Sequence, residues 1–212
     1  MTDGDARDGY VAEAIRSHRL VAVLRRVEPR ERLIALVDEL VEDGVRVVEI
    51  TMDFPSAAGD LAAVRERVAG RGVVVGAGTI LDRGHLEDAL TAGADFGVAP
   101  IVDLGLLDAA REAGLPFVPG AMTPTEVATA WAAGATFVKL FPASAVGPAL
   151  VRELRSPLPH VEVIPTGGVD AANAAAFLEA GAAAVGIGSA LLRADRGGRR
   201  AIVRIVAEAG SP

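Results

Sequence analysis

The sequence predicts an α/β protein of the (β/α)8 class, a TIM barrel, with an extra helix at the N-terminal end. Apolar strand-like runs alternate with alanine-rich amphipathic runs along the whole chain. Eight such strands can be counted, and successive strands lie about 25 residues apart, as in barrels of this class. Strands that alternate with helices imply parallel pairing, because each helix returns the chain to the same end of the sheet.

The expected strands are short runs rich in valine, isoleucine and phenylalanine. A Gly-Ala pair before several of them indicates regular repeating units. No Gly-x-Gly-x-x-Gly motif opens a helix after the first strand, so an open doubly wound sheet is the second choice. In order, the strands are Leu20–Arg25, Val47–Thr51, Val73–Thr79, Phe96–Pro100, Pro116–Gly120, Phe137–Phe141, Val161–Thr166 and Ala183–Gly188.

The expected helices follow from capping residues at their starts and glycines at their ends. Pro29 suits a first helical turn, and Ser56 is expected to cap the helix that follows it. Gly93, Gly114 and Gly181 come directly after predicted helix ends. In order, the helices are Asp8–His18, Glu28–Asp43, Ser56–Val68, Asp82–Ala92, Asp103–Ala113, Thr123–Ala133, Pro148–Leu154, Asp170–Ala180 and Arg199–Ala209.

Length and composition favour one soluble domain over residues 1–212. Hydrophobic residues make up 51% of the chain, enough for a large core. The net charge of -7 argues against nucleic-acid or anionic-membrane partners, and no cysteine is present for disulfides or thiolate chemistry. The polar, acidic start, Met1–Tyr10, resembles neither a signal peptide nor a transit peptide. No apolar run reaches the roughly 18 residues of a membrane span, so a cytoplasmic protein is expected.

Lys139 is the only lysine, and it lies in the apolar run from Phe137 to Pro142. Burial disfavours the ammonium form, and a neutral amine can attack a carbonyl to form a Schiff base. Arginine cannot do so, which makes the placement of a single lysine here an indication of covalent catalysis. The alternative is a lysine left over from a general preference for arginine, extending from an edge strand to solvent.

Alternation along the strands predicts which side chains point into the barrel, because residues two apart share a face. The expected inward groups are Phe137, Lys139 and Phe141 in one strand and Val47, Glu49 and Thr51 in another. Arg25 is placed with Val21 and Val23, Thr79 with Val75 and Ala77, and Thr166 with Ile164. Glu49 is then either the acid/base partner of the amine or a structural ion pair with Lys139 or Arg25.

Glycine-rich segments at strand ends predict anion sites. Thr166-Gly167-Gly168 and Gly186-Ile187-Gly188-Ser189 follow the last two strands, where barrel enzymes commonly bind phosphate. The alternative is that these glycines only make tight turns. Gly76-Ala77-Gly78-Thr79 offers a further N–H-rich loop, expected to bind a substrate carboxylate together with Arg25.

Seven stretches in order resemble the 2-dehydro-3-deoxy-phosphogluconate (KDPG/KHG) aldolase family: VAVLR, GVRVVEIT, VVVGAGTI, GADFGVAP, FVPGAMTPTE, FVKLFPAS and VIPTGGV, the last followed by AVGIGSAL. The resemblance implies a class I aldolase that cleaves the 6-phosphorylated keto sugar acid to pyruvate and glyceraldehyde 3-phosphate. It also implies a homotrimer without metal or cofactor.

The resemblance also assigns roles to residues of this chain. Lys139 resembles the Schiff-base lysine, Glu49 the general acid/base, and Arg25 and Thr79 the contacts of the pyruvate carboxylate. The other residues assigned by the resemblance are the pocket walls Pro100, Phe141 and Thr166 and the phosphate loops Gly167, Gly168, Gly188 and Ser189.

One position departs from the pattern of some family members, which carry an arginine four residues after the catalytic glutamate. Asp53 stands there instead. Other members lack that arginine and have one at the end of the first strand, so Arg25 is expected to replace it. Galactonate-type relatives share most of these motifs, and the sugar stereochemistry is left open.

Two other function classes are compatible with a phosphate-binding barrel. An isomerase or epimerase would use paired carboxylates or a metal and would not need a lysine on the sixth strand. A non-catalytic sugar-phosphate binding protein would need no activated amine. The three histidines, His18, His85 and His160, lie far apart without acids at metal-ligand spacing, and no metal site is expected.

Overall fold

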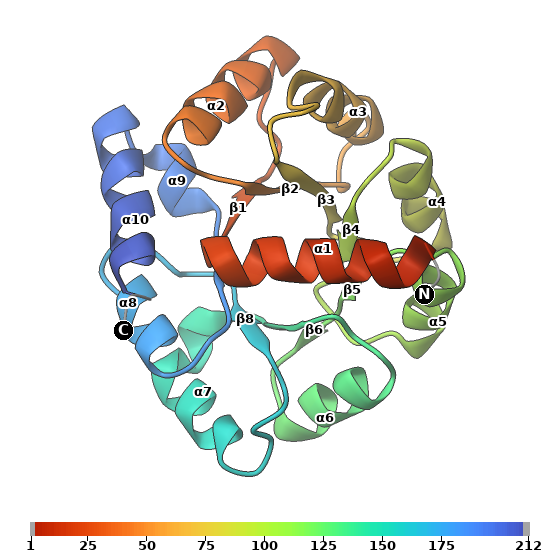
Figure 1. Cartoon of the computed structure of the whole chain (residues 1–212), viewed down its shortest axis with the longest axis vertical. Helices are drawn as coiled ribbons and strands as arrows, with labels where there is room; N and C mark the ends of the chain where they lie inside the picture. The colour runs from red at the N-terminus through yellow and green to blue at the C-terminus, as the bar shows by residue number, and fades with distance from the viewer. Residues whose placement is uncertain (1–2, 210–212) are drawn as a thin grey trace.

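The computed structural model of the chain describes residues 3–209, and its strands lie inside a ring of helices (Figure 1). The strands are β1 (Leu20–Leu24), β2 (Val47–Thr51), β3 (Val74–Gly78), β4 (Phe96–Val98), β5 (Phe117–Val118), β6 (Gly120–Ala121), β7 (Val138–Leu140), β8 (Val163–Pro165) and β9 (Val185–Ile187). The helices are α1 (Asp3–His18), α2 (Arg30–Glu42), α3 (Ala57–Arg67), α4 (Arg83–Thr91), α5 (Leu104–Glu112), α6 (Pro124–Ala132), α7 (Gly147–Arg155), α8 (Ala174–Glu179), α9 (Ser189–Arg193) and α10 (Arg196–Glu208), with a 3-10 turn at Ala143–Ala145.

The strands form two parallel sheets, as the alternation of strands and helices predicts. One sheet has the order β5-β4-β3-β2-β1-β9 and the other the order β6-β7-β8. Every pair of neighbouring strands runs parallel. An isolated parallel bridge between Thr166 and Gly186 connects the end of β8 to β9. The α/β class and the parallel pairing are therefore confirmed.

The predicted strand Pro116–Gly120 is divided into β5 and β6 at Pro119. Proline has no N–H to donate to a neighbouring strand, so the ladder is interrupted there. The carbonyl of Pro119 still accepts a hydrogen bond from the Lys139 N–H at 2.9 Å. The interruption is local, and the chain continues in the same direction into β6.

The strands separate two apolar clusters. An inner cluster lies between the strands and is covered by α1, which crosses them in Figure 1. An outer cluster joins the opposite strand faces to the surrounding helices. The buried members of the inner cluster are Val11, Ala12, Ile15, Val21, Val23, Val47, Val74, Phe96, Val98, Val118, Phe137, Ile164 and Ala184.

The predicted inward face of β3 is wrong. Val75 and Ala77 belong to the outer cluster, and Val74 belongs to the inner one. Gly76 and Gly78 share the inward face with Val74. They have no side chains, and other side chains fill the interior beside them. A Cβ on Gly76 would lie 2.3 Å from the ring of Phe96. Gly76 and Gly78 therefore belong to β3, where the lack of a side chain leaves space for neighbouring side chains. They do not form the predicted N–H-rich loop.

The starts of α3 and α8 also differ from the prediction. The Ser56 hydroxyl donates to Asp60 at 2.8 Å and makes no hydrogen bond to the backbone at the start of α3. Asp170 accepts from the Ala172 N–H at 2.9 Å and forms a local turn, so α8 begins four residues later at Ala174. The sequence does not predict α9, because its five residues are too few to show the hydrophobic period of a helix.

Within residues 3–209, no helix is both long and apolar enough to cross a bilayer.

Candidate active site

Lys139 lies in the middle of β7 with its side chain directed inward. It is 5% exposed, between Val138 and Leu140, whose side chains belong to the outer cluster. The Nζ atom lies 5.2 Å from the centroid of the Phe141 ring. The predicted inward orientation of Lys139 is therefore confirmed, and this residue is not a surface lysine of an edge strand.

Glu49 of β2 lies opposite Lys139. Its side chain is almost fully buried, and its Oε1 atom lies 4.0 Å from Lys139 Nζ. Among the described residues, Glu49 Oε1 has no hydrogen-bond partner. A carboxylate held near an amine without a short hydrogen bond retains acceptor capacity for a third group, such as a reacting hydroxyl.

The room for this carboxylate depends on Gly78 of β3. The two residues meet because β2 and β3 are neighbours, with Glu49 paired to Gly76 and Thr51 to Gly78. A Cβ on Gly78 would lie 1.9 Å from Glu49 Oε1. Any other residue at position 78 would therefore displace the carboxylate.

A pocket with mainly apolar walls surrounds the lysine and the glutamate. Thr166 at the end of β8 adds a third polar group, and its hydroxyl donates to the Ile164 carbonyl at 3.3 Å. Low polarity strengthens electrostatic interactions between the few polar groups present. The pocket is lined by Val21, Glu49, Phe96, Val98, Val118, Lys139, Ile164 and Thr166.

Arg25 and Thr79 are brought together at the carboxyl ends of β1 and β3. An Nη2 N–H of Arg25 donates to Thr79 Oγ1 at 3.1 Å. Thr79 has a φ of 59°, a left-handed conformation that a β-branched residue rarely adopts. This backbone conformation interrupts the alternation of β3, which explains how Thr79 reaches Arg25 although Val75 and Ala77 face the helices.

Asp53 contacts Arg25, a contact that the sequence does not predict. Its Oδ2 atom lies 2.9 Å from Nη1 of Arg25 and 3.1 Å from Nη2 of Arg26. Burial acts to raise the pKa of Asp53, but the nearby Thr51 hydroxyl and the two arginines hold that pKa below its ordinary value. The two residues meet because β1 and β2 are adjacent parallel strands whose carboxyl ends lie side by side.

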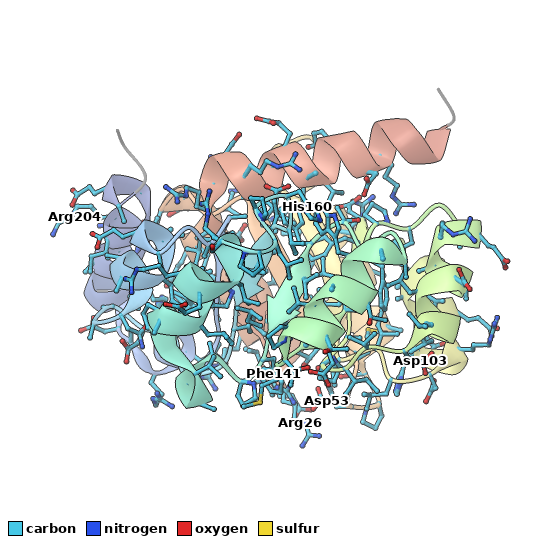
Figure 2. The ribbon with its side chains drawn as sticks, turned by 90° about the horizontal axis from the view of Figure 1, so that it is seen from below. Arg26, Asp53, Asp103, Phe141, His160 and Arg204 are labelled. Atoms are coloured by element: carbon cyan, nitrogen blue, oxygen red, sulfur yellow. The ribbon has the colours of Figure 1, made fainter. Side chains whose placement is uncertain are left out.

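Figure 2 shows where this group of residues lies in the molecule. Arg26, Asp53 and Phe141 lie at one end of the strands, here called the mouth. Helix α1 lies at the opposite end, and His160 lies toward that end as well. Arg25 contacts Asp53, and Thr79 contacts Arg25. Both expected substrate contacts therefore lie at the mouth.

The two predicted phosphate loops follow neighbouring strands at this end. Gly167 and Gly168 have φ values of 89° and 82°, which favour glycine. A Cβ on Gly167 would lie 3.0 Å from the Phe141 ring, and one on Gly168 would lie 2.5 Å from Ser144. The Thr166–Gly186 bridge joins the strands that precede the two loops, so the loops are adjacent.

The remaining predicted residues are farther from the amine or more exposed. Gly188 lies against the carbonyl of Val23 in β1, and Ser189 is exposed as the first residue of α9. Pro100 is partly buried after β4, next to Gly120, which is itself paired with Lys139. Pro100 is therefore separated from the lysine by one strand.

The sequence of residues 11–206 matches the family described as "KDPG and KHG aldolase". The chain belongs to that family. A relative from Rhizobium meliloti (strain 1021), "Probable 2-dehydro-3-deoxy-6-phosphogalactonate aldolase", is 34% identical over 82% of this chain and 82% of its own length. The "KHG/KDPG aldolase" of Escherichia coli (strain K12) is 33% identical over 76% of each chain.

A solved structure described as "Native KDPGal structure" is similar to this member of the family in three dimensions. The TM-score is 0.82, with 32% sequence identity over 90% of this chain and 95% of that one. The family is one of class I aldolases, which are carbon–carbon lyases. The resemblance drawn from the seven sequence stretches is thus confirmed at the level of the family.

Proposed function

We propose that the protein is a class I aldolase that cleaves a 6-phosphorylated 2-dehydro-3-deoxy sugar acid to pyruvate and glyceraldehyde 3-phosphate. One observation carries this proposal: the only lysine of the chain is buried, and its Nζ atom lies 4.0 Å from a buried glutamate. In the proposed mechanism Lys139 forms the Schiff base and Glu49 transfers protons.

The reaction begins at the C2 ketone of the substrate. The uncharged amine of Lys139 attacks C2 to give a carbinolamine, which loses water to give a protonated imine. The imine nitrogen then carries the positive charge that accepts electrons in the next step. The mechanism therefore requires no metal and no organic cofactor.

Cleavage follows by proton transfer to Glu49. The carboxylate takes the proton of the C4 hydroxyl, directly or through one water molecule, as the C3–C4 bond breaks. The electron pair of that bond moves to C3 and the imine, which leaves an enamine of pyruvate on Lys139 and releases glyceraldehyde 3-phosphate. Return of the proton to C3 and hydrolysis of the imine release pyruvate and restore the amine.

Substrate binding is assigned to the mouth. Arg25 and Thr79 receive the carboxylate next to C2, since a guanidinium and a hydroxyl suit a carboxylate. The backbone N–H groups of the glycine-rich loops receive the phosphate. We assign Thr166 to the wall of the pocket around Lys139 and Pro100 and Phe141 to the wall of the mouth above it. The phosphate is assigned to the loops that contain Gly167, Gly168, Gly188 and Ser189.

Two epimeric substrates are candidates, 2-dehydro-3-deoxy-6-phosphogluconate and 2-dehydro-3-deoxy-6-phosphogalactonate. The galactonate-derived compound is favoured by the names of the 34% identical Rhizobium meliloti relative and of the similar solved structure. The gluconate-derived compound is favoured by the name of the Escherichia coli relative. Coupled assays with both substrates side by side would identify the better one by its kcat/KM.

We further infer that the two sheets close into one (β/α)8 barrel, with α1 as its extra N-terminal helix, and that residues 1–212 act as one domain. Only Pro119 separates β5 from β6, and the Thr166–Gly186 bridge joins the other edges. The inner cluster, which contains residues of α1, supports the same arrangement.

A homotrimer in the cytoplasm is proposed as the working form. Exposed apolar side chains that follow the carboxyl ends of three strands support self-association: Leu81 after β3, Ile101 after β4 and Met122 after β6 are 45%, 49% and 42% exposed. Light scattering of the purified protein would measure the mass of the assembly. Ile101→Glu should reduce that mass if these side chains lie in the interface between subunits.

The decisive experiment is trapping of the imine. Incubation with pyruvate and sodium borohydride should add one reduced pyruvate to the peptide that contains Lys139 and should abolish activity. Full inactivation with an unmodified Lys139 would overturn the proposal. A chelator should leave the rate unchanged, whereas a metal-dependent aldolase would lose activity.

A further inference from the structure

The groups assigned to the substrate carboxylate are already engaged with one another in the structure. Nη1 of Arg25 donates to Asp53 Oδ2 at 2.9 Å, and Nη2 donates to Thr79 Oγ1 at 3.1 Å. The carboxylate of Asp53 therefore already occupies one of the positions at Arg25 that a substrate carboxylate would take.

Asp53 is shared between two arginines. Its Oδ2 atom lies 3.1 Å from Nη2 of Arg26, and the same guanidinium donates to the backbone carbonyl of Asp53 at 2.9 Å. Arg26 has a left-handed backbone with φ of 50°, and its side chain is 60% exposed. Arg26 can therefore keep Asp53 paired at the rim of the mouth when Arg25 turns to another partner.

The pairing of Asp53 with Arg25 is incomplete. Both arginines use the same oxygen, Oδ2, and Oδ1 is buried without a hydrogen-bond partner of good geometry among the described residues. A two-oxygen contact between a carboxylate and a guanidinium is stronger than this one-oxygen contact. A ligand carboxylate with both oxygens free can thus compete for Arg25.

We propose that Asp53 competes with the substrate carboxylate for Arg25, and that Arg26 retains Asp53 when Arg25 is released to the substrate. The inference rests on the proposed function, in which Arg25 binds the carboxylate next to the reacting ketone. Asp53 and Arg26 then set the affinity for the keto acid without touching it, as positioning residues for Arg25.

The proposal predicts opposite effects for the two residues. Asp53→Asn removes the competing charge and should lower the pyruvate concentration at half-maximal borohydride trapping by about threefold, the range of a partly exposed ion pair. Arg26→Gln leaves Asp53 to Arg25 alone and should raise that concentration by about twofold.

A double-mutant cycle separates this competition from a general change of charge at the mouth. If Arg26 acts only through Asp53, Arg26→Gln should have no effect on pyruvate trapping in the Asp53→Asn background. If the effect were general electrostatics, Arg26→Gln would weaken trapping equally in both backgrounds, and the proposal would be overturned.

Two controls complete the experiment. Asp38 of α2 also pairs with two arginines, Arg67 of α3 and Arg71 in the turn before β3, and it has no contact with Arg25, so Asp38→Asn should leave trapping unchanged. Acetone has the ketone of pyruvate without the carboxylate, and its trapping should not respond to Asp53→Asn. A response to acetone would assign the effect to the lysine and overturn the inference.

The failure of this inference can be distinguished from failure of the proposed function. If the unmodified protein does not trap pyruvate at Lys139, the proposed function fails. If it traps pyruvate and Asp53→Asn leaves the half-maximal concentration unchanged or raises it, the aldolase mechanism stands and the competition at Arg25 is wrong.

Discussion

Lys139 Nζ and Glu49 Oε1 face each other at 4.0 Å, with both side chains almost fully buried between the strands. The two residues come from β7 and β2, which belong to different sheets. Each buried polar group is compensated partly by the other, so removal of one leaves its partner buried and poorly paired. Variants of this pair therefore need a measurement of folding beside the measurement of activity.

Replacement of the lysine should abolish turnover. Lys139→Arg places a guanidinium there, which cannot form an imine, and the rate should fall by more than about a thousandfold, as for loss of a catalytic nucleophile. Lys139→Met has no charge and should be equally inactive. Circular dichroism should show both variants folded, and measurable imine trapping or turnover in either would contradict the assignment of the Schiff base.

Replacement of the glutamate should separate binding from proton transfer. Glu49→Gln keeps the size of the side chain, and kcat should fall by about a hundredfold to ten-thousandfold, the usual contribution of a general acid or base. Long incubation with pyruvate and borohydride should still modify Lys139, because the amine remains. A kcat within about threefold of the unmodified protein would exclude Glu49 as the proton-transfer residue.

A methyl group at position 78 should act through Glu49. The new Cβ of Gly78→Ala would lie 1.9 Å from Glu49 Oε1, and β3 is held by β2 and β4 on either side. The carboxylate must therefore move, and kcat should fall by a factor similar to that of Glu49→Gln, with a lower melting temperature. Gly105→Ala in α5 is the control, since its nearest contact is 3.3 Å, and it should remain active.

The pH dependence of stability should contain a contribution from the start of α6. Glu126 accepts hydrogen bonds from the N–H groups of Met122 and Thr123 and from the Thr123 hydroxyl, and these bonds lower the pKa of Glu126 below 4.5. Because the folded-state pKa is lowered, the stabilisation is complete above about pH 4.5 and is lost as the pH falls through the folded-state pKa.

This contribution can be measured by comparison with a glutamine variant. Glu126→Gln keeps a hydrogen-bond acceptor but removes the negative charge from the first turn of α6, and it should lower the free energy of unfolding by about 0.3–1 kcal/mol near neutral pH. The difference between the two proteins should shrink as the pH falls from 6 to about 3 in urea unfolding experiments. A difference that does not depend on pH would contradict this account.

The residues that carry the proposed chemistry could be predicted from the sequence because strand alternation is a local property. Val138 and Leu140 on one face of β7 place Lys139 on the other, and Val48 and Ile50 do the same for Glu49 in β2. Neither placement requires knowledge of which strands are neighbours. The parallel α/β class followed for a similar reason, since it depends on the order of elements along the chain.

The errors occurred where local patterns carry no information. Two inward positions of β3 are glycines, which have no side chain to reveal the buried face, and the left-handed Thr79 interrupts the alternation after them. The pairing of Arg25 with Asp53 joins residues 28 positions apart and became visible only with the ends of β1 and β2 side by side. The sequence therefore indicates only that Asp53 removes a contact, whereas in the structure it makes one.

The position of α1 has a practical consequence. It lies across the end of the strands opposite Arg26, Asp53 and Phe141, and Val11 and Ile15 anchor it to the inner cluster (Figure 2). A linker or bead attached to the solvent side of this helix, for example at the exposed Tyr10, would leave the opposite opening free. The protein should thus tolerate immobilisation through that side, and a tethered preparation should process its reactant as fast as the free one.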